Sequence, residues 1–250
     1  MLTQPTLDHL NAMKMFFLAE AFQRQLASPQ LTALSFEERL GMLIDAEYSG
    51  REQRKLDQRL RGAKLRHPAS LEDIDFKAAR GLHRELVLSL GRCDWIRERQ
   101  NLLLTGPTGV GKSYLACAFA ERACRSGFTA LYLRAPRLYQ ELAVARGDGS
   151  YGRLLARFTR THLLIIDDWG LAPLKDPERR DLLEVIEDRY ERASTLITSQ
   201  LPVKAWHEVI GDATLADAIC DRLVHCAHRI ELKGPSLRAT KTRPAGKGTE

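Results

Sequence analysis

The stretch Leu102-Leu-Leu-Thr-Gly-Pro-Thr-Gly-Val-Gly-Lys-Ser113 decides the fold of this 250-residue chain. It joins a short apolar run to a glycine-rich turn, and we predict that a helix begins at Lys112. Glycines let the backbone curl so that successive amides point at one anion, and the helix adds the positive end of its dipole. This spacing, after a strand and before a helix, is that of a phosphate loop. We expect the loop to bind ATP through Gly106, Pro107, Thr108, Gly109, Val110, Gly111, Lys112, Ser113 and Tyr114.

A second chemical signal lies further along, in Leu163-Leu-Ile-Ile-Asp-Asp168. A buried strand that ends in two carboxylates is unfavourable unless positive charge lies at its tip. Mg²⁺ on a bound nucleotide supplies that charge, and we expect Ser113 and Asp167 to hold it. Lys112 is then expected to contact the β- and γ-phosphates, and Asp168 to activate water for attack on the γ-phosphate.

From about residue 95 the chain alternates short apolar runs with helical patterns. Runs that are apolar throughout suit parallel strands covered on both faces. Repeated alternation of strands and helices predicts an α/β fold with a doubly wound parallel five-stranded sheet. The strands are predicted at residues 101–105, 130–133, 162–166, 195–198 and 229–232. The helices between them are predicted at residues 112–125, 136–146, 151–160, 178–192 and 213–227.

The N-terminal part of the chain has helical patterns only. Ser35 and Glu38 form a capping box, and apolar residues follow at helical spacing. The run from Arg51 to Arg66 holds seven basic and two acidic residues, and most of the basic ones share one arc of a helix. We therefore predict four segments: a small all-helical DNA- or partner-binding domain at 1–67, a linker and lead-in helix at 68–94, an ATPase domain at 95–238, and a basic disordered tail at 239–250.

Composition narrows the class of protein. No stretch approaches the roughly 18–20 apolar residues of a membrane span, and the N-terminus lacks the pattern of a secretory signal. Five cysteines without a C-x-x-C pair favour reduced thiols and a cytoplasmic location. The segment His225-Cys-Ala-His228 lacks a second ligand pair at a zinc spacing, so we interpret it as structural. The net charge of +6 is compatible with a polyanionic partner.

These motifs resemble those of the AAA+ ATPases and, more narrowly, of the IstB family, the transposition-helper ATPases of bacterial insertion sequences. The IstB family is related to the DnaC-type helicase loaders. The resemblance covers nearly the whole chain. Beyond the phosphate loop, it is carried by the following segments: Leu34–Glu38, Leu71–Phe76, Asp167–Pro173, Asp188–Glu191, Thr198–Pro202, Leu215–Leu223 and His228–Gly234.

The resemblance implies further roles. Arg222 matches the segment in which AAA+ proteins place an arginine finger, which acts on the nucleotide of a neighbouring subunit. Ser199 and Gln200 fall at the sensor position beside the γ-phosphate, with Gln200 favoured; the alternative is that they cap their strand. Two features depart from the family pattern: Asp168 stands where many AAA+ proteins have Glu, and Pro235 replaces a Glu. The chain is also expected to lack the C-terminal helical lid of many AAA+ proteins.

Three basic zones are candidates for binding double-stranded DNA: the helix at 51–66, the segment 134–160 and the tail. A solvated helix face is the usual explanation for any one of them. With the family resemblance, we expect at least one to bind phosphates without reading sequence, since no base-reading motif is visible. The predicted contacts are Arg51, Arg54, Lys55, Arg59, Arg134, Arg137, Arg146 and Arg153.

The resulting hypothesis is an ATP-dependent helper of insertion-sequence transposition. It would form homo-oligomers on target DNA, remodel that DNA, and recruit and stimulate a cognate transposase. Its expected cofactors are ATP and Mg²⁺. We expect it to hydrolyse ATP to ADP and phosphate, and we expect DNA to stimulate that hydrolysis. The leading alternative is a replicative-helicase loader with the same ATPase core, whose helicase docks on the N-terminal helices. A small-molecule kinase is disfavoured because no substrate lid is recognisable.

Overall fold

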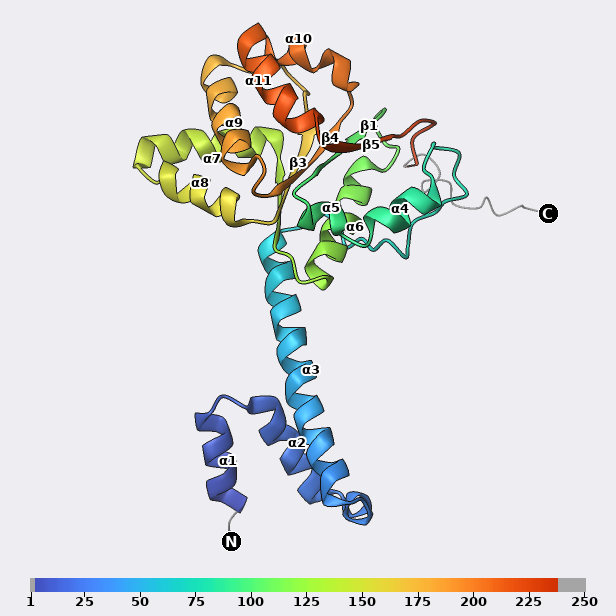
Figure 1. Ribbon diagram of the computed structural model, residues 1–250, viewed down its shortest axis with the longest axis vertical. Coiled ribbons are helices and arrows are strands. Elements are labelled where there is room, and N and C mark those ends of the chain that lie inside the picture. The colour runs from blue at the N-terminus through green and yellow to red at the C-terminus, as the bar shows by residue number, and fades with distance from the viewer. Residues whose placement is uncertain (1–2, 238–250) are drawn as a thin grey trace, which may run out of the picture. The chain divides into compact units, whose positions relative to one another are not determined.

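The computed structural model describes residues 3–237 (Figure 1). The predicted tail at 239–250 lies outside the described residues. The first part of the chain is helical, as predicted from its sequence. Its elements are α1 (Thr3–Ala12), α2 (Phe16–Ala27), the short 3-10 helix η1 (Pro29–Ala33) and the long α3 (Phe36–Ala63).

The predicted capping box fixes the start of α3. The Ser35 amide donates to Glu38 Oε2 at 2.8 Å, and the Glu38 amide donates to Ser35 Oγ at 3.2 Å. Each side chain therefore satisfies a backbone group that the first turn of a helix leaves without a partner. This pair confirms the predicted boundary before Phe36.

The rest of the chain forms a five-stranded sheet with its covering helices. The strands are β1 (Asn101–Thr105), β2 (Ala130–Arg134), β3 (Leu163–Trp169), β4 (Ser194–Ser199) and β5 (Ala227–Glu231). Their order is β2-β3-β4-β1-β5 and every neighbouring pair is parallel, which confirms the predicted fold class. The other elements are α4 (Arg84–Leu90), α5 (Asp94–Arg97), α6 (Lys112–Arg125), α7 (Ala135–Asp148), α8 (Tyr151–Arg160), α9 (Asp176–Arg189), η2 (Val203–Ala205), α10 (Trp206–Ile210) and α11 (Ala213–Val224).

Both faces of the sheet are covered. Helices α7 to α11 lie on one face, where Leu103, Leu164 and Ile197 join their apolar side chains in one core cluster. Neighbouring strand residues point to the opposite face, which α6 covers (Figure 1). Because each strand is buried on both sides, its sequence is apolar throughout, and this is the pattern that identified it.

Strand β3 is longer than predicted. It continues past the expected end at residue 166 to Trp169, with a shift in its pairing to β4 between Ile166 and Trp169. Asp168 accounts for the irregularity because its φ is +60°, in the left-handed region that side chains other than glycine rarely adopt. The strand is thus irregular at Asp168, the second of its two carboxylate residues.

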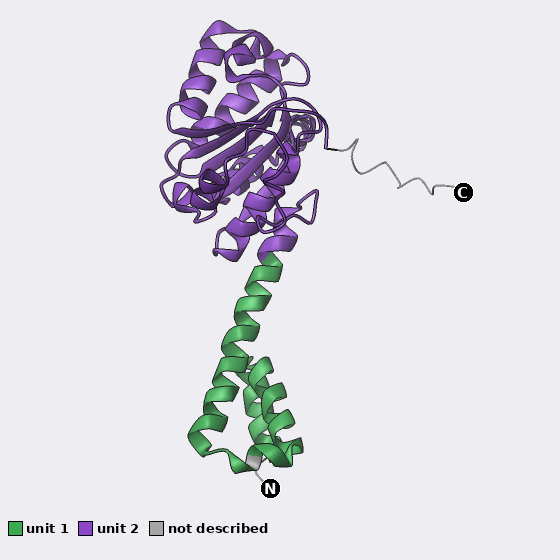
Figure 2. Cartoon of the chain, turned by 90° about the vertical axis from the view of Figure 1, so that its right-hand side faces the viewer, with its two compact units in different colours: residues 1–58 green, residues 59–250 purple. Residues whose placement is uncertain are grey.

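The chain divides into two compact units, residues 1–58 and 59–250 (Figure 2). Helix α3 begins in the first unit and ends in the second. The segment 68–94, predicted as a linker and lead-in helix, belongs to the second unit, where Leu71, Val87 and Leu90 are buried. Within residues 3–237 no helix combines the length and apolar character needed to cross a bilayer.

Candidate nucleotide-binding site

The glycine-rich turn lies between the end of β1 and the start of α6, as its sequence predicts. Two of its glycines are required by close approaches. A Cβ at Gly106, whose φ is +140°, would lie 2.1 Å from the Leu232 carbonyl oxygen, and one at Gly109 would lie 2.0 Å from Ser236 Oγ. The segment that follows β5 therefore packs against the loop, and only glycine fits beneath it.

Within the loop, Pro107 and Thr108 are exposed, whereas Val110 is buried and anchors the turn in the core. Tyr114 is half-buried in the first turn of α6. The Lys112 side chain is 7% exposed, and its ammonium donates to the carbonyls of Gly106 at 2.7 Å and Pro107 at 2.8 Å. The loop is thus curled around its own lysine.

Ser113 and Asp167 lie together, as predicted for a magnesium site. Ser113 Oγ is 2.8 Å and 3.0 Å from the two carboxylate oxygens of Asp167, whose side chain is fully buried. A hydroxyl and a carboxylate are hard oxygen ligands, which are the kind that Mg²⁺ prefers. The donor set therefore fits this ion, and these two residues are the ones that would hold it.

Two residues that sequence reasoning missed hold the Asp167 carboxylate in place. The Thr198 hydroxyl donates to Asp167 Oδ1 at 2.5 Å, and the Tyr132 hydroxyl donates to Oδ2. Burial raises the pKa of the Tyr132 hydroxyl, and the neighbouring Asp167 carboxylate raises it further, so Tyr132 stays a donor. Both lie near the carboxyl end of a predicted strand, and Thr198 also opens the Thr198–Pro202 segment that carries part of the family resemblance, but neither signal assigned them this role.

Asp168 leaves the core and faces two arginines. Its side chain is 20% exposed, and Oδ2 accepts from Arg134 Nε at 2.9 Å. The left-handed turn at Asp168 directs its amide to Thr198 Oγ1 at 3.1 Å. Thr198 therefore contacts both carboxylate residues, accepting at one and donating to the other.

Arg66 approaches both carboxylates from outside the sheet. Its Nη1 lies 3.7 Å from Asp167 Oδ2 and 3.8 Å from Asp168 Oδ2. The pKa of Arg66 is raised, first by a hydrogen bond with Tyr132 and then by the charges of the two aspartates, against the opposing effect of burial. Its sequence placed it on the predicted DNA-facing arc, but the structure places it at this site.

The two residues predicted as sensors differ in their contacts. Ser199 is fully buried, and its hydroxyl donates to the Trp169 carbonyl at 2.9 Å and accepts from the Leu201 amide at 3.1 Å. Gln200 is exposed, and its Oε1 accepts from the Thr108 hydroxyl of the phosphate loop at 2.8 Å. Only Gln200 therefore reaches the loop with its side chain.

Two further segments support the loop from the side. The buried Arg80 donates from Nη1 to the Val110 carbonyl at 3.2 Å, and the Leu237 amide donates to the Gly109 carbonyl at 3.0 Å. Sequence reasoning did not single out Arg80. It sits after the Leu71–Phe76 segment, which carries part of the family resemblance, but has no motif of its own.

Comparison with known proteins decides the family. A family model described as IstB-like ATP binding protein matches residues 8–245. The chain belongs to this family. Among its relatives, an insertion sequence ATP-binding protein of Sinorhizobium fredii is 54% identical over 243 residues, which are 97% of this chain and 99% of the relative. The insertion sequence IS21 ATP-binding protein of Pseudomonas aeruginosa is 33% identical, over 95% of this chain and 89% of the relative.

Solved structures agree with this IstB-like assignment at the level of the fold. The crystal structure of DnaI has a TM-score of 0.56 at 23% identity and covers 66% of this chain and 91% of that one. The DnaC helicase loader has a TM-score of 0.54 at 19% identity and covers 66% of this chain and 97% of that one. The family assignment and the phosphate-loop fold together establish an ATP-binding protein of the insertion-sequence type.

In this IstB-like chain, the predicted arginine finger lies far from its own phosphate loop. The Asn101 side chain, at the first residue of β1, donates to the Arg222 carbonyl at 3.0 Å. The loop follows the last residue of the same strand, so at least about 13 Å of strand separates the two ends. The Arg222 guanidinium pairs with Glu187 and lies 5.9 Å from the centre of the Tyr190 ring.

Most of the residues predicted to bind DNA already have partners in the chain. In the first unit, Arg51 pairs with Glu47, Arg54 lies over the rings of Phe16 and Phe17, and Lys55 pairs with Glu52. In the second unit, Arg59 is half-buried, and Arg134 contacts Asp168. Arg146 pairs with Asp181 and Glu184 and lies against Tyr151, so it ties α7 to α8 and α9.

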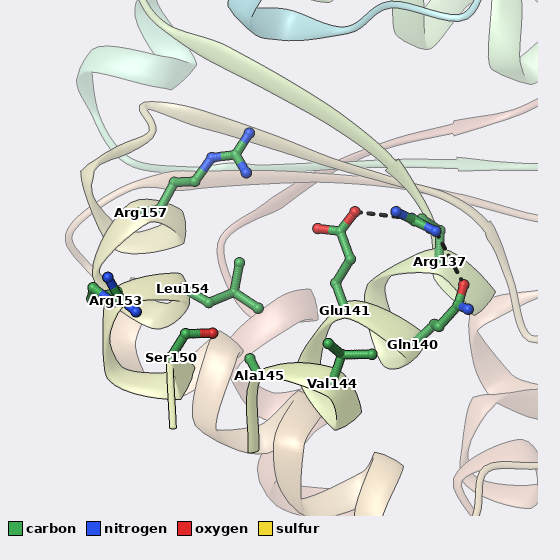
Figure 3. A pocket seen from close by; sticks show the side chains of 9 residues that line it. All are labelled: Arg137, Gln140, Glu141, Val144, Ala145, Ser150, Arg153, Leu154 and Arg157. Atoms are coloured by element: carbon green, nitrogen blue, oxygen red, sulfur yellow. Dashed lines mark hydrogen bonds and ion pairs between the residues drawn. The ribbon is translucent and has the colours of Figure 1, made fainter. Parts of the chain in front are cut away.

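The remaining two predicted DNA contacts line one groove. Arg137 on α7 and Arg153 on α8 lie on opposite sides of a groove of about 450 Å³, with Arg157 beside Arg153 (Figure 3). Arg137 pairs with Glu141 at 2.9 Å. Within the described residues, Arg153 and Arg157 form no salt bridge, and both are exposed. Their spacing of four places them on one face of α8.

Proposed function

We propose that this chain hydrolyses ATP as a helper of insertion-sequence transposition, assembling on duplex DNA and recruiting a transposase supplied by another chain. The observation that carries the proposal is the contact between Ser113 and Asp167. It brings the phosphate loop and the carboxylate pair of β3 to one point, where a triphosphate and its metal ion are held together.

In this proposal the chain's own residues position the triphosphate. The amides of the loop and the positive end of α6 face the phosphates, and Lys112 exchanges its loop carbonyls for phosphate oxygens. Ser113 and Asp167 hold Mg²⁺, which neutralises charge on the β- and γ-phosphates when bound. Asp168 orients a water molecule and accepts its proton, and Gln200 follows the state of the loop through Thr108.

The distance of Arg222 from its own loop supports a site completed by a second copy of the chain. A guanidinium at the far end of β1 cannot stabilise charge on the γ-phosphate bound in the same chain. In a neighbouring copy it is free to do so once it leaves Glu187. ATP binding would then favour assembly, because the nucleotide lies between two copies.

For DNA, the proposal rests on the exposed arginines of the α7–α8 groove. Arg153 and Arg157 lie on one face of α8, and Arg160 follows at a spacing of three. Three guanidiniums along one helix face suit the phosphates of a duplex, which they bind without reading bases. Arg134 and Arg146, which their acidic partners already hold, are poorer candidates.

A transposase is the proposed protein partner because relatives with 54% and 33% identity are named as insertion sequence proteins. The likeness to the DnaC helicase loader, at 19% identity, concerns the fold alone. Pull-down of this chain with its cognate transposase and with the host replicative helicase distinguishes these partners. Capture of the transposase alone is expected, whereas capture of the helicase alone would favour the loader.

The experiment that tests the core of the proposal is the ATPase rate of the purified chain with and without duplex DNA, with Lys112→Ala as the inactive control. Hydrolysis that DNA stimulates is expected. Sedimentation should also show larger assemblies with ATP and DNA than with either alone. Absence of both DNA stimulation and ATP-dependent assembly would contradict the proposal.

A further inference from the structure

The end of α3 is anchored beside the two carboxylates of β3. Ala63, its last residue, is fully buried, and Lys64 ends the helix in the left-handed region with φ of +51°. The Cys117 thiol of α6 is buried, and the backbone groups of His67 and Arg66 lower its pKa against the larger, opposing effect of burial. These contacts bring the Arg66 guanidinium to Asp167 and Asp168 at 3.7 Å and 3.8 Å.

The charges at this point balance without a metal ion. Two guanidiniums, of Arg66 and Arg134, face the carboxylates of Asp167 and Asp168, and Tyr132 stays neutral. Arg134 contacts Asp168 only, whereas Arg66 approaches both aspartates. A divalent cation held by Ser113 and Asp167 would repel the Arg66 guanidinium, because like charges at this range in a partly buried site interact strongly.

We infer that Arg66 competes with the divalent cation for the Asp167–Asp168 carboxylates, so that cation binding and the anchoring of the end of α3 oppose one another. The inference rests on the proposed function, since it takes the cation to be that of a bound nucleotide. Arg66 is a positioning residue in this account: it acts through the two carboxylates rather than on the nucleotide.

The competition has a consequence for the helix that precedes Arg66. If the cation displaces the guanidinium, the segment 64–67 loses one of its ties to the second unit. Linkage requires the reverse effect to be equally large, so a partner that pulls on α3 changes the affinity of the site for the cation. Since α3 begins in the first compact unit, it provides a covalent route from that unit to the nucleotide.

The test measures binding of a fluorescent, non-hydrolysable ATP analogue by the full chain as Mg²⁺ is titrated. Arg66→Ala should lower the half-saturating Mg²⁺ concentration at least threefold, and Arg66→Lys should lower it less because it keeps the charge. Arg92→Ala is the matched control, since Arg92 is an exposed arginine of the same unit. A half-saturating concentration that is unchanged or higher in Arg66→Ala would overturn the inference.

A second measurement needs no variant and therefore no assumption about folding. Amide hydrogen exchange of residues 60–67 in the wild-type chain should become faster with the analogue and Mg²⁺ than with the analogue and a chelator. Equal or slower exchange would overturn the inference while leaving Mg²⁺-dependent nucleotide binding intact. A wild-type chain that binds no analogue at any Mg²⁺ concentration would remove the proposed function and this inference together.

Discussion

At the scale of single residues, the site depends on a threonine to which the sequence analysis assigned no role. Thr198 donates to Asp167 and accepts from the amide of Asp168, and its side chain is fully buried. One hydroxyl thus fixes the orientation of the proposed metal ligand and the backbone of the residue proposed to activate water. Its neighbour Ser199, which was predicted as a sensor with Gln200 favoured over it, bonds backbone groups.

Replacing this threonine gives a specific expectation. Thr198→Val keeps the shape but leaves the Asp168 amide without its acceptor and removes one of the donors to the buried Asp167 carboxylate, which costs about 1–3 kcal/mol of folding free energy. Chemical denaturation of the chain measures that loss, and the ATPase rate should fall as well. Thr214→Val, at an exposed position of α11, is the matched control. Stability and rate equal to those of the control would contradict the role given to Thr198.

The site residues that could be predicted belong to short motifs of neighbouring residues. Lys112 and Ser113 belong to one loop and Asp167 to one strand end, so spacing alone indicated them. Tyr132 and Arg66 were not predictable, because the sheet and the end of α3 bring them together from distant parts of the chain. Arg66 was even placed on the DNA-facing arc, since helical periodicity continues past the point where α3 ends.

At the scale of elements, we predict that the exposed arginines of α8 bind duplex DNA. Arg153→Glu combined with Arg157→Glu should weaken duplex binding and reduce the slope of log K against log salt by about 2, since two phosphate contacts are lost. Fluorescence anisotropy with a labelled duplex at several salt concentrations measures both. Arg92→Glu controls for charge elsewhere in the same unit. An equal loss of affinity in the control would show a general charge effect and not a surface on α8.

Helices α2 and α3 are tied together by one buried carboxylate. Glu47 on α3 is 6% exposed, pairs with Arg51 at 2.5 Å and accepts from the Leu18 amide of α2 at 2.9 Å. Burial alone would raise the pKa of Glu47, but the hydrogen bonds from Arg51 and Leu18 outweigh it and the pKa is lowered below 4.5. The carboxylate therefore stabilises the first unit in its charged form.

The sign of that shift sets a pH dependence. The stabilisation is fully present above pH 4.5 and is lost as pH falls through the lower folded-state pKa. Glu47→Gln should speed amide exchange in Phe16–Ala27 at pH 7, by an amount that corresponds to about 1–2 kcal/mol. The difference in exchange rate between the variant and the wild type should shrink as the pH falls below 4.5. A difference that stays constant with pH would show that the charge of Glu47 is not the cause.

The main strands and helices of the second unit followed from the sequence, although α10 was not predicted and the helix predicted at 213–227 ends at Val224, before β5. Strands apolar throughout and helices between them predicted the order of the second unit, because a parallel sheet buries both faces of each strand. The extension of β3 to Trp169 was missed. The two carboxylates indicated the end of a strand. The left-handed backbone of Asp168 instead lets β3 pair with β4 again at Trp169.

At the scale of the whole molecule, one chain holds only part of the proposed catalytic machinery. The phosphate loop and the carboxylates lie together at one end of the sheet, and Arg222 lies beyond the other end, paired with Glu187. The sequence indicated each part separately. The family resemblance implied that Arg222 acts on a neighbouring subunit, but the separation itself depends on the direction in which β1 runs between the two parts.

The most direct test of this account mixes two inactive variants. Arg222→Ala should bind ATP but hydrolyse it slowly, and Asp168→Ala should lack the group that activates water. In mixed assemblies on DNA, an intact site forms wherever an Asp168→Ala copy offers its Arg222 to the loop of an Arg222→Ala copy. The account predicts that the ATPase rate of the mixture exceeds that of either variant alone. A mixture no faster than its components, although both bind ATP and assemble on DNA, would contradict a site shared between two copies.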